Sequence, residues 1–119
     1  MHYYNATLVR VIDGDTVDAM IDLGFDIQVK KRIRLAGINA PESRTRNKVE
    51  KKLGLAAKER LKELCVGNIK VKSLGKGKYG RILGIPYTED GKDICKVLIK
   101  EGHAVEYHGG TKTKVWGDY

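Results

Sequence analysis

The sequence predicts a small β-barrel of five strands with two packed helices. Three segments near the N-terminus alternate apolar and polar residues, which is the period of half-buried strands. A later segment repeats apolar residues every three or four positions, as a helix with one buried face does. Two more strands and a short helix follow. Five short strands with a helix between the third and the fourth suit a Greek-key barrel of the OB-fold type, and a small α+β sandwich is the structural alternative.

The first three strands are expected to form an antiparallel meander at residues 3–12, 16–23 and 25–35. Asp13-Gly14-Asp15 is the first turn, where glycine can adopt a positive φ. The second strand alternates strictly, and its two faces consist of Val17, Ala19, Ile21 and Leu23 on one side and Thr16, Asp18, Met20 and Asp22 on the other. In the third strand Lys31 breaks the apolar alternation, which predicts a bulge or a strand edge.

The helical segment runs from Val49 to Cys65 and ends before Gly67, a typical C-terminal cap. Its expected buried stripe consists of Val49, Leu53, Ala56, Ala57, Leu61 and Leu64. Two further strands are predicted at 69–74 and 81–87, and a short helix at 94–101 with Asp93 as its N-cap. We therefore expect one domain over residues 1–107 and a short basic tail at 108–119.

The chain is strongly basic. Its 119 residues include 23 Lys and Arg against 15 Asp and Glu, which gives a net charge of +8. A compact domain with this charge favours a polyanionic partner, and nucleic acid is the first candidate. Charge alone leaves open a protein that is basic only for solubility.

Two cysteines, Cys65 and Cys95, are too few for a disulfide framework and are expected to be buried thiols. No apolar run approaches the length of about 18 residues that a membrane span needs. No signal peptide is visible. We therefore expect a monomeric cytoplasmic protein of bacterial or phage origin with no membrane contact.

Three loops are expected to meet at one rim of the barrel, at residues 13–15, 37–42 and 78–81. Asp and Asn oxygens suit a hard cation, calcium most naturally. Arginine forks suit phosphate oxygens and the charge of a five-coordinate phosphorus transition state. Glu42 can orient or deprotonate an attacking water. Together these groups are sufficient for phosphodiester hydrolysis, whereas Arg34 and Glu42 alone would indicate a surface salt bridge in a turn.

Three motifs carry a family resemblance: Val-Ile-Asp13-Gly-Asp15-Thr-Val, Arg34-Leu-Ala-Gly-Ile-Asn39-Ala-Pro-Glu42 and Lys78-Tyr-Gly-Arg81. In this order they resemble the motifs of the staphylococcal nuclease (thermonuclease) family, and the resemblance covers Tyr4 to Tyr107. It implies an OB-fold nuclease that depends on one calcium ion, hydrolyses DNA and RNA, and leaves 3′-phosphates.

The resemblance also implies roles for residues at matching positions. Arg34 and Arg81 match phosphate-binding arginines, and Glu42 matches the general base or water-positioning group. The metal positions are Asp15 as a direct ligand, Asp13 in the outer sphere, Asn39, and Ala40 through its backbone carbonyl. Nucleotide contacts are expected from Lys78, Tyr79 and Tyr107.

The sequence departs from the family pattern at Asn39, where an aspartate is usual. An amide keeps an oxygen ligand but removes one negative charge, which weakens cation affinity. The site would then need more calcium, prefer another divalent ion, or be inactive. The segment between Asp15 and Arg34 is also longer than in the best-known member, so we expect the second hairpin to protrude beside the site.

Two interpretations of the function follow. The first is an active nuclease with little sequence specificity, which the matching spacing of Arg34, Glu42 and Arg81 favours. The alternative is a catalytically weakened nucleic-acid-binding OB-fold module, supported mainly by Asn39. A basic interaction domain with no nucleic-acid role leaves the three motifs unexplained.

Overall fold

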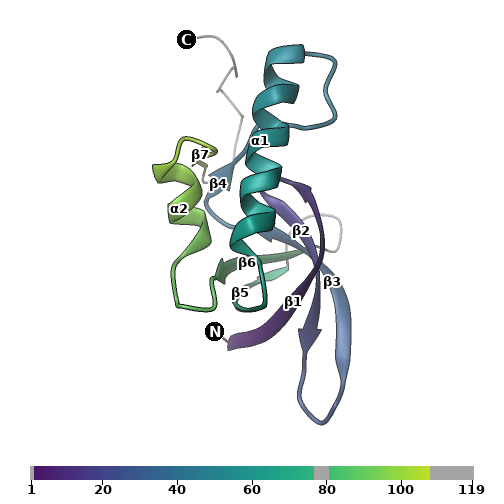
Figure 1. Ribbon diagram of the computed structural model, residues 1–119. Coiled ribbons are helices and arrows are strands. Elements are labelled where there is room, and N and C mark those ends of the chain that lie inside the picture. Colours follow the sequence, from purple (N-terminus) through teal and green to yellow (C-terminus); the bar gives the residue numbers. More distant parts are fainter. Residues whose placement is uncertain (1, 77–80, 108–119) are drawn as a thin grey trace.

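Five strands close into a barrel in the order β1-β2-β3-β6-β5. The computed structural model describes residues 2–76 and 81–107. All neighbouring pairs are antiparallel except β3 with β6, whose parallel pairing closes the barrel (Figure 1). The five-stranded OB-type barrel with two helices is confirmed. Its strands are β1 (His2–Asp13), β2 (Thr16–Asp22), β3 (Gln28–Leu35), β5 (Asn68–Lys76) and β6 (Ile82–Tyr87).

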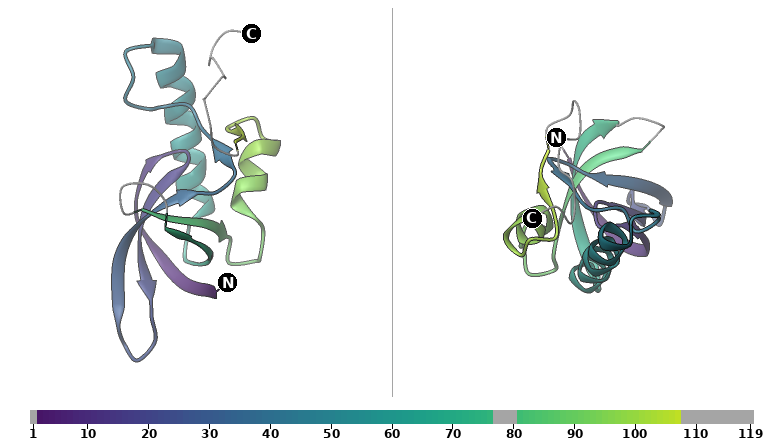
Figure 2. Two further views of the ribbon diagram at one scale, coloured as in Figure 1. Left: turned by 180° about the vertical axis from the view of Figure 1, so that it is seen from behind. Right: turned by 90° about the horizontal axis from the view of Figure 1, so that it is seen from above.

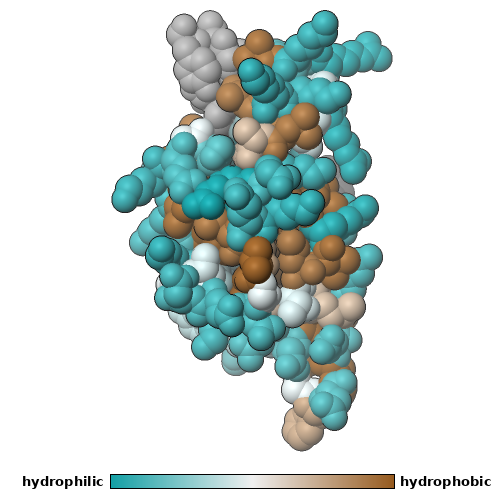
Figure 3. Space-filling view, in the orientation of Figure 1, coloured by the Kyte–Doolittle hydropathy of each residue, from teal (hydrophilic) through white to brown (hydrophobic). Residues whose placement is uncertain are grey.

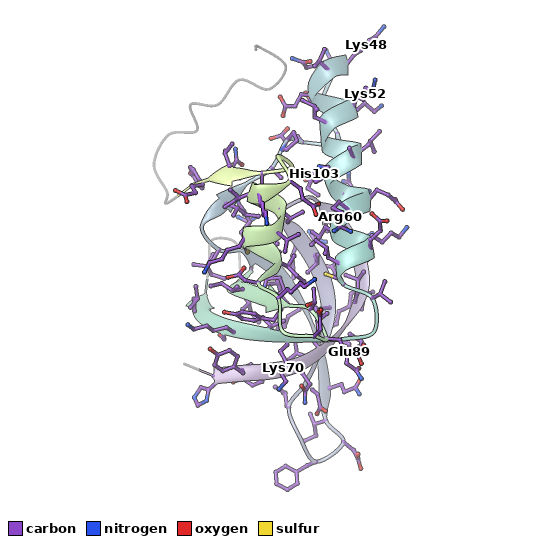
Figure 4. All side chains as sticks on the ribbon, turned by 60° about the vertical axis from the view of Figure 1, so that its left-hand side comes forward. Lys48, Lys52, Arg60, Lys70, Glu89 and His103 are labelled. Atoms are coloured by element: carbon purple, nitrogen blue, oxygen red, sulfur yellow. The ribbon has the colours of Figure 1, made fainter. Side chains whose placement is uncertain are left out.

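Two helices pack on the barrel, α1 (Lys48–Leu64) and α2 (Ile94–Lys100). The Asn47 side chain caps α1 by accepting the backbone N–H groups of Val49 and Glu50. The predicted cap Asp93 accepts the N–H of Lys96 at the start of α2. The helices lie side by side (Figure 2). Arg60 projects from α1 (Figure 4). It donates two hydrogen bonds, of 2.6 and 2.9 Å, to the Glu101 carboxylate at the end of α2.

The core fills the barrel and continues under the two helices. Its fully buried side chains include Val17, Ile33, Leu35, Ile38, Leu61, Ile69, Val71, Ile94 and Leu98. Burying each such side chain stabilises the fold by about 1.5–3 kcal/mol. Because Ile38 belongs to this core, the loop that carries the next residue, Asn39, is anchored to the barrel.

The first half of β2 is buried on both of its faces. Thr16 and Asp18, which share the polar face of the alternation, are buried together with Val17 and Ala19. Side chains from both neighbouring strands cover the outer face of β2, because Arg10 on β1 and Arg32 on β3 both bond to Asp18. The alternation of residues along β2 gives no information about side chains from neighbouring strands that cover it.

The third strand begins later than predicted. Phe25 and Asp26 form a turn with positive φ (54° and 61°), closed by the Ile27 N–H bonding to the Gly24 carbonyl at 2.9 Å. Phe25 is 97% exposed. Of the two alternatives predicted for Lys31, the bulge is wrong, because the β2–β3 register is unbroken from Thr16↔Arg34 to Asp22↔Gln28. The strand edge is confirmed, because β3 pairs with β6 only from Ile33 to Leu35 and Lys31 therefore pairs with β2 alone.

The hairpin of β2 and β3 does protrude, but away from the candidate site. Its tip extends from the lower end of the barrel, whereas the loops of interest lie near β4 and α1 (Figure 1). The Thr16↔Arg34 pair and the Asp22↔Gln28 pair are opposite ends of one ladder. These ends are about 20 Å apart at the usual rise per strand residue. The expectation that the hairpin flanks the site is therefore wrong.

Only part of the predicted apolar stripe of α1 packs on the barrel. The buried residues are Gly54, Ala57 and Leu61, while Val49 is half exposed and Ala56 is exposed. The first turns of α1 reach beyond the barrel (Figure 1), and apolar side chains interrupt the hydrophilic surface there (Figure 3). Helical period identified the helix, but not how far the barrel extends beneath it.

Two short strands, β4 (Ile38–Asn39) and β7 (Val105–Glu106), were not predicted because two residues carry no period. They pair with each other antiparallel. No helix in residues 2–76 and 81–107 is long and apolar enough to cross a membrane. Lys78, Tyr79 and the predicted tail 108–119 lie outside the described residues.

Candidate active site

The candidate site lies where the β1–β2 turn meets the loop that runs from β4 to α1. Asp13 and Asp15 flank the turn, while Asn39 and Ala40 stand at the start of the facing loop. The Asp15 carboxylate joins the two segments, since Oδ2 accepts the Ala40 N–H at 2.9 Å and Oδ1 accepts the Thr16 hydroxyl at 3.0 Å. The structure thus brings Asp15 and Ala40 together.

Asp13 makes a second connection between these segments. Its Oδ1 accepts the Ser43 N–H at 3.2 Å and also the Ser43 hydroxyl. Ser43 directly follows Glu42, so Asp13 fixes the backbone beside that glutamate. The predicted outer-sphere residue is therefore held in the site by the loop rather than standing free in solvent.

Asn39 contains an unsatisfied polar atom. The residue is 5% exposed, and its Oδ1 is the one buried side-chain nitrogen or oxygen without a hydrogen-bond partner among residues 2–76 and 81–107. Leaving such an acceptor unpaired costs about 1–3 kcal/mol. A bound cation would satisfy it, because carbonyl and carboxylate oxygens are the donors that hard divalent cations prefer.

The donor set therefore fits a hard cation, with Asn39 Oδ1 and the remaining lone pairs of the Asp15 carboxylate as ligands. Within the described ranges no group of three or more His, Cys, Asp or Glu could hold a metal ion. The predicted metal-site side chains of Asp13, Asp15 and Asn39 include only two carboxylates, so they do not form such a group. A site with so few charged ligands should bind a cation weakly.

Arg34 lies against this site and contacts backbone oxygens. Its Nη1 donates to the Leu35 carbonyl at 2.8 Å, and its Nη2 donates to the Ile38 carbonyl at 2.8 Å. Nη2 is also 3.5 Å from Asp15 Oδ2, and the side chain is only 14% exposed. The guanidinium thus holds the β3–β4 turn closed and places a positive charge beside Asp15, a structural task that the motif did not indicate.

Glu42 is exposed, as a group that handles water should be. Its N–H donates to Glu50 Oε2 on α1 at 3.0 Å. Its carbonyl oxygen lies against the helix at Gly54, where a Cβ would come within 2.4 Å of it. Only glycine allows this approach, so Gly54 positions the Glu42 backbone.

Gly14 has a similar task, and its predicted role is corrected. It does not adopt a positive φ. A Cβ at Gly14 would instead lie 2.7 Å from the Ala57 Cβ on α1 and 2.9 Å from the Ala40 Cβ. These small residues let the turn, the loop and the helix meet. The signal in the sequence was Gly54 and Ala57, two small residues three positions apart on one face of the predicted helix.

Of the remaining predicted residues, the structure describes Arg81 and Tyr107, which come from later parts of the chain. Arg81 immediately precedes β6, whose first residue pairs with Ile33, so Arg81 lies at the level of Arg32 on the neighbouring strand β3. The Tyr107 N–H donates to the Gly37 carbonyl at 2.8 Å, beside the turn that leads to Asn39. Lys78 and Tyr79 precede Arg81, outside the described ranges.

Comparisons with known proteins indicate one family. Residues 32–115 match the family model described as Staphylococcal nuclease homologue. A protein named Uncharacterized endonuclease from Escherichia coli is 34% identical over 101 residues, which are 84% of this chain and 59% of that protein. A Micrococcal nuclease from Shigella flexneri is 30% identical over 113 residues, with 87% and 59% covered.

Endonuclease YhcR from Bacillus subtilis is 34% identical over 113 residues, which are 87% of this chain but 9% of that larger protein. The chain therefore spans 59% of the length of the Escherichia coli and Shigella flexneri relatives. The family model covers most of the chain, including the β3–β4 turn and the loop to α1. This chain belongs to the staphylococcal nuclease homologue family.

Proposed function

We propose that this chain is a metal-dependent nuclease that hydrolyses phosphodiester bonds of DNA, RNA or both with little sequence specificity and leaves 3′-phosphates. The observation that carries the proposal is the buried, unpartnered Asn39 Oδ1 near Asp15, on the loop that leads to Glu42. The names of the relatives, two endonucleases and a micrococcal nuclease, support the same reaction class.

In this proposal Asp15 and Asn39 hold one divalent cation, calcium or another hard ion, with Asp13 in the outer sphere and the Ala40 backbone carbonyl beside it. When bound, the cation offsets negative charge on the phosphate. Asp15 contributes the only formal negative charge among the direct side-chain ligands, so weak binding is expected.

The protein groups perform the remaining steps. Arg34 and Arg81 bind the phosphate oxygens and stabilise the charge that develops as phosphorus becomes five-coordinate. Glu42 orients the attacking water or accepts its proton, and its exposure gives water access. Lys78 and Tyr79 flank the phosphate of the bound nucleotide, and Tyr107 contacts its base or sugar.

The second candidate function is a nucleic-acid-binding module with a weakened site. The neutral Asn39 favours it, and so does the engagement of Arg34 with backbone carbonyls, because those donors are not available to a phosphate. Both candidates bind nucleic acid, so hydrolysis is the property that distinguishes them.

The deciding experiment is digestion of plasmid DNA and of RNA over a calcium series, with a chelator as blank and with magnesium and manganese as alternatives. We expect calcium-dependent cleavage that Glu42→Gln lowers by about 10²–10⁴-fold, because a positioned acid–base group contributes that much. Affinity for DNA should remain.

Glu59→Gln is the matched control, since Glu59 is an exposed glutamate on α1 outside the site. It should cleave like the wild type. Unchanged turnover in Glu42→Gln would remove that residue from the reaction. Absence of cleavage with every metal, together with salt-sensitive DNA binding, would establish the binding module instead.

The ligand role of Asn39 has its own test. Asn39→Asp should bind calcium about tenfold more tightly, since one added charge worth about 1.4 kcal/mol changes affinity by that factor. Isothermal titration calorimetry measures the change. Asn68→Asp adds the same charge at an exposed position at the start of β5 and should leave calcium affinity unchanged. Equal affinity in Asn39→Asp and Asn68→Asp would exclude Asn39 as a ligand.

A further inference from the structure

Three charged side chains form a row across the outer face of β1, β2 and β3, and the site described above does not use them. Asp18 on β2 lies opposite Arg10 on β1 and opposite Arg32 on β3 in the strand register. Arg10 Nε donates to Asp18 Oδ2 at 3.1 Å. Arg32 donates Nε to Oδ1 at 2.8 Å and Nη2 to Oδ2 at 3.2 Å.

The two arginines remain accessible although the carboxylate between them is covered. Asp18 is 3% exposed, whereas the side chains of Arg10 and Arg32 are 57% and 44% exposed. A guanidinium has five N–H donors. Arg10 uses one of them on Asp18 and Arg32 uses two, which leaves donors on both for a ligand in solvent.

Asp18 also holds the two guanidiniums in fixed positions. Fixing a long side chain before a ligand arrives removes part of the entropic cost of ordering that side chain at binding. The three groups together carry a net charge of +1. The row is therefore a preorganised cationic surface, because its two arginines are only half neutralised by the single carboxylate.

This surface is continuous with the candidate site. Arg34 is two residues from Arg32 on the same face of β3, which is about 7 Å along the strand. Arg81 lies at the level of Arg32 on the other side of β3, because the next residues, Ile82 and Ile33, pair. Arg32 thus lies next to both arginines to which the proposed function assigns the phosphate.

The same face continues one step further with Lys30, which lies opposite Met20 and is exposed. Beyond it stand Gln28 and Asp22, which pair at the base of the hairpin tip. The cations therefore extend about 13 Å from Arg34 to Lys30 and stop where an acidic residue begins. Residues two apart on a strand are separated by about the distance between successive phosphates of a nucleic-acid strand.

We propose that Arg10, Arg32 and Lys30 form a second phosphate-binding subsite that holds the polynucleotide backbone beyond the bond at Arg34 and Arg81. The inference rests on the proposed function for the location of that bond. It assigns the ligand class as a polynucleotide of several residues, held through its phosphates without base recognition. Long strands should therefore bind more tightly than short ones.

The test is fluorescence anisotropy with labelled thymidine oligonucleotides, a trimer and a dodecamer, in chelator so that no hydrolysis occurs. The first variant is Arg10→Gln with Asp18→Asn and Arg32→Gln, which avoids leaving Asp18 as an unpaired buried charge. The second is Lys30→Gln, at an exposed position that does not threaten folding. Each variant lowers the net charge by one, as does the control Lys96→Gln on α2.

We expect the triple variant to bind the dodecamer about tenfold more weakly than Lys96→Gln does, with the trimer almost unaffected. The slope of log affinity against log salt should fall by about 1.4 in the triple variant and about 0.7 in Lys30→Gln, because each phosphate neutralised on a single strand contributes about 0.7. The proposal would be overturned if both the triple variant and Lys30→Gln bound the dodecamer with the same affinity as the control Lys96→Gln. If the triple variant does not fold, Lys30→Gln decides alone.

A duplex dodecamer distinguishes recognition of the phosphate backbone in general from recognition of an extended single strand. Weaker binding of both forms identifies the backbone common to them, and weaker binding of the single strand alone identifies an extended strand. Because binding is measured without hydrolysis, an inactive wild type would refute the proposed nuclease and leave this measurement intact. Cleavage by the wild type would support the proposed nuclease. If the triple variant and Lys30→Gln then bound oligonucleotides with unchanged affinity, the second phosphate-binding subsite would be refuted.

Discussion

At the scale of single residues, Asp18 shows how neighbours set the chemistry of a buried carboxylate. The Arg32 hydrogen bond lowers the pKa of Asp18 most, burial opposes it, and Arg10 adds a second lowering contact. The result is a pKa of about 2, against a usual value of 3.8. The carboxylate therefore stays ionised through the whole range in which nucleases are assayed.

This shift predicts a defined acid sensitivity. The pKa of Asp18 is lower in the folded state than in the unfolded state. Its contribution to stability is therefore complete above pH 3.8 and is lost as the pH falls from 3.8 towards about 2. It amounts to about 2 kcal/mol. In Asp18→Asn this part of the pH dependence should vanish, as urea unfolding over acidic pH will show.

Asp26→Asn, at the exposed hairpin tip, controls for the loss of one carboxylate. Its free energy of unfolding should change with pH as that of the wild type does throughout the acid range. An acid transition in Asp18→Asn as steep as that of the wild type would mean that other groups cause the loss of stability.

At the scale of elements, the contact between α1 and the site loops depends on missing side chains. In an ordinary helix Gly→Ala stabilises by about 0.5–1 kcal/mol. At Gly54 the added Cβ would lie 2.4 Å from the Glu42 carbonyl oxygen, so we expect the opposite sign. Gly54→Ala should destabilise by about 1–3 kcal/mol and lower turnover, because Glu42 must move.

Thermal unfolding and plasmid digestion test both parts of this prediction. Ala56→Gly, at an exposed position two residues along α1, should cost about 1 kcal/mol through helix propensity and leave turnover unaltered. A higher melting temperature for Gly54→Ala would show that the loop yields without cost and that Gly54 does not position Glu42.

At the scale of the whole molecule, the core shared by barrel and helices encloses both thiols. Cys65, at the end of α1, and Cys95, in α2, are unpaired and buried, and burial raises the pKa of each to about 12. The expected buried thiols are confirmed. Reaction with a thiol reagent requires a thiolate and access, and the folded protein provides neither.

Labelling of Cys65 and Cys95 should therefore proceed only through unfolding. We expect the rate with a chromogenic disulfide to rise with denaturant in parallel with the unfolded fraction. Val66→Cys places a thiol at the exposed neighbour of Cys65 and should react at once in the native state. Native labelling of the wild type at the rate of that added thiol would refute the closed core.

Sequence determined the features that depend on neighbours along the chain. The alternation of apolar residues located the barrel strands, the helical period located α1, and Asp93 was recognised as a cap because it precedes an apolar helix. The order of these elements was enough for the barrel. The predicted strand boundaries were wrong where a turn stands in place of the strand. This is the case at Phe25, whose positive φ no residue pattern indicated.

Only the tertiary structure decided the features that depend on residues far apart in the chain. The cover over Asp18 comes from β1 and β3, the space at Gly14 is limited by α1, and the unpartnered oxygen of Asn39 is known only when its surroundings are known. Local propensity acts over a few residues, whereas burial, hydrogen-bond partners and close approaches are set by strands and helices that meet after the barrel has closed. Sequence therefore predicted the barrel and the motif residues, and folding decided what each of them contacts.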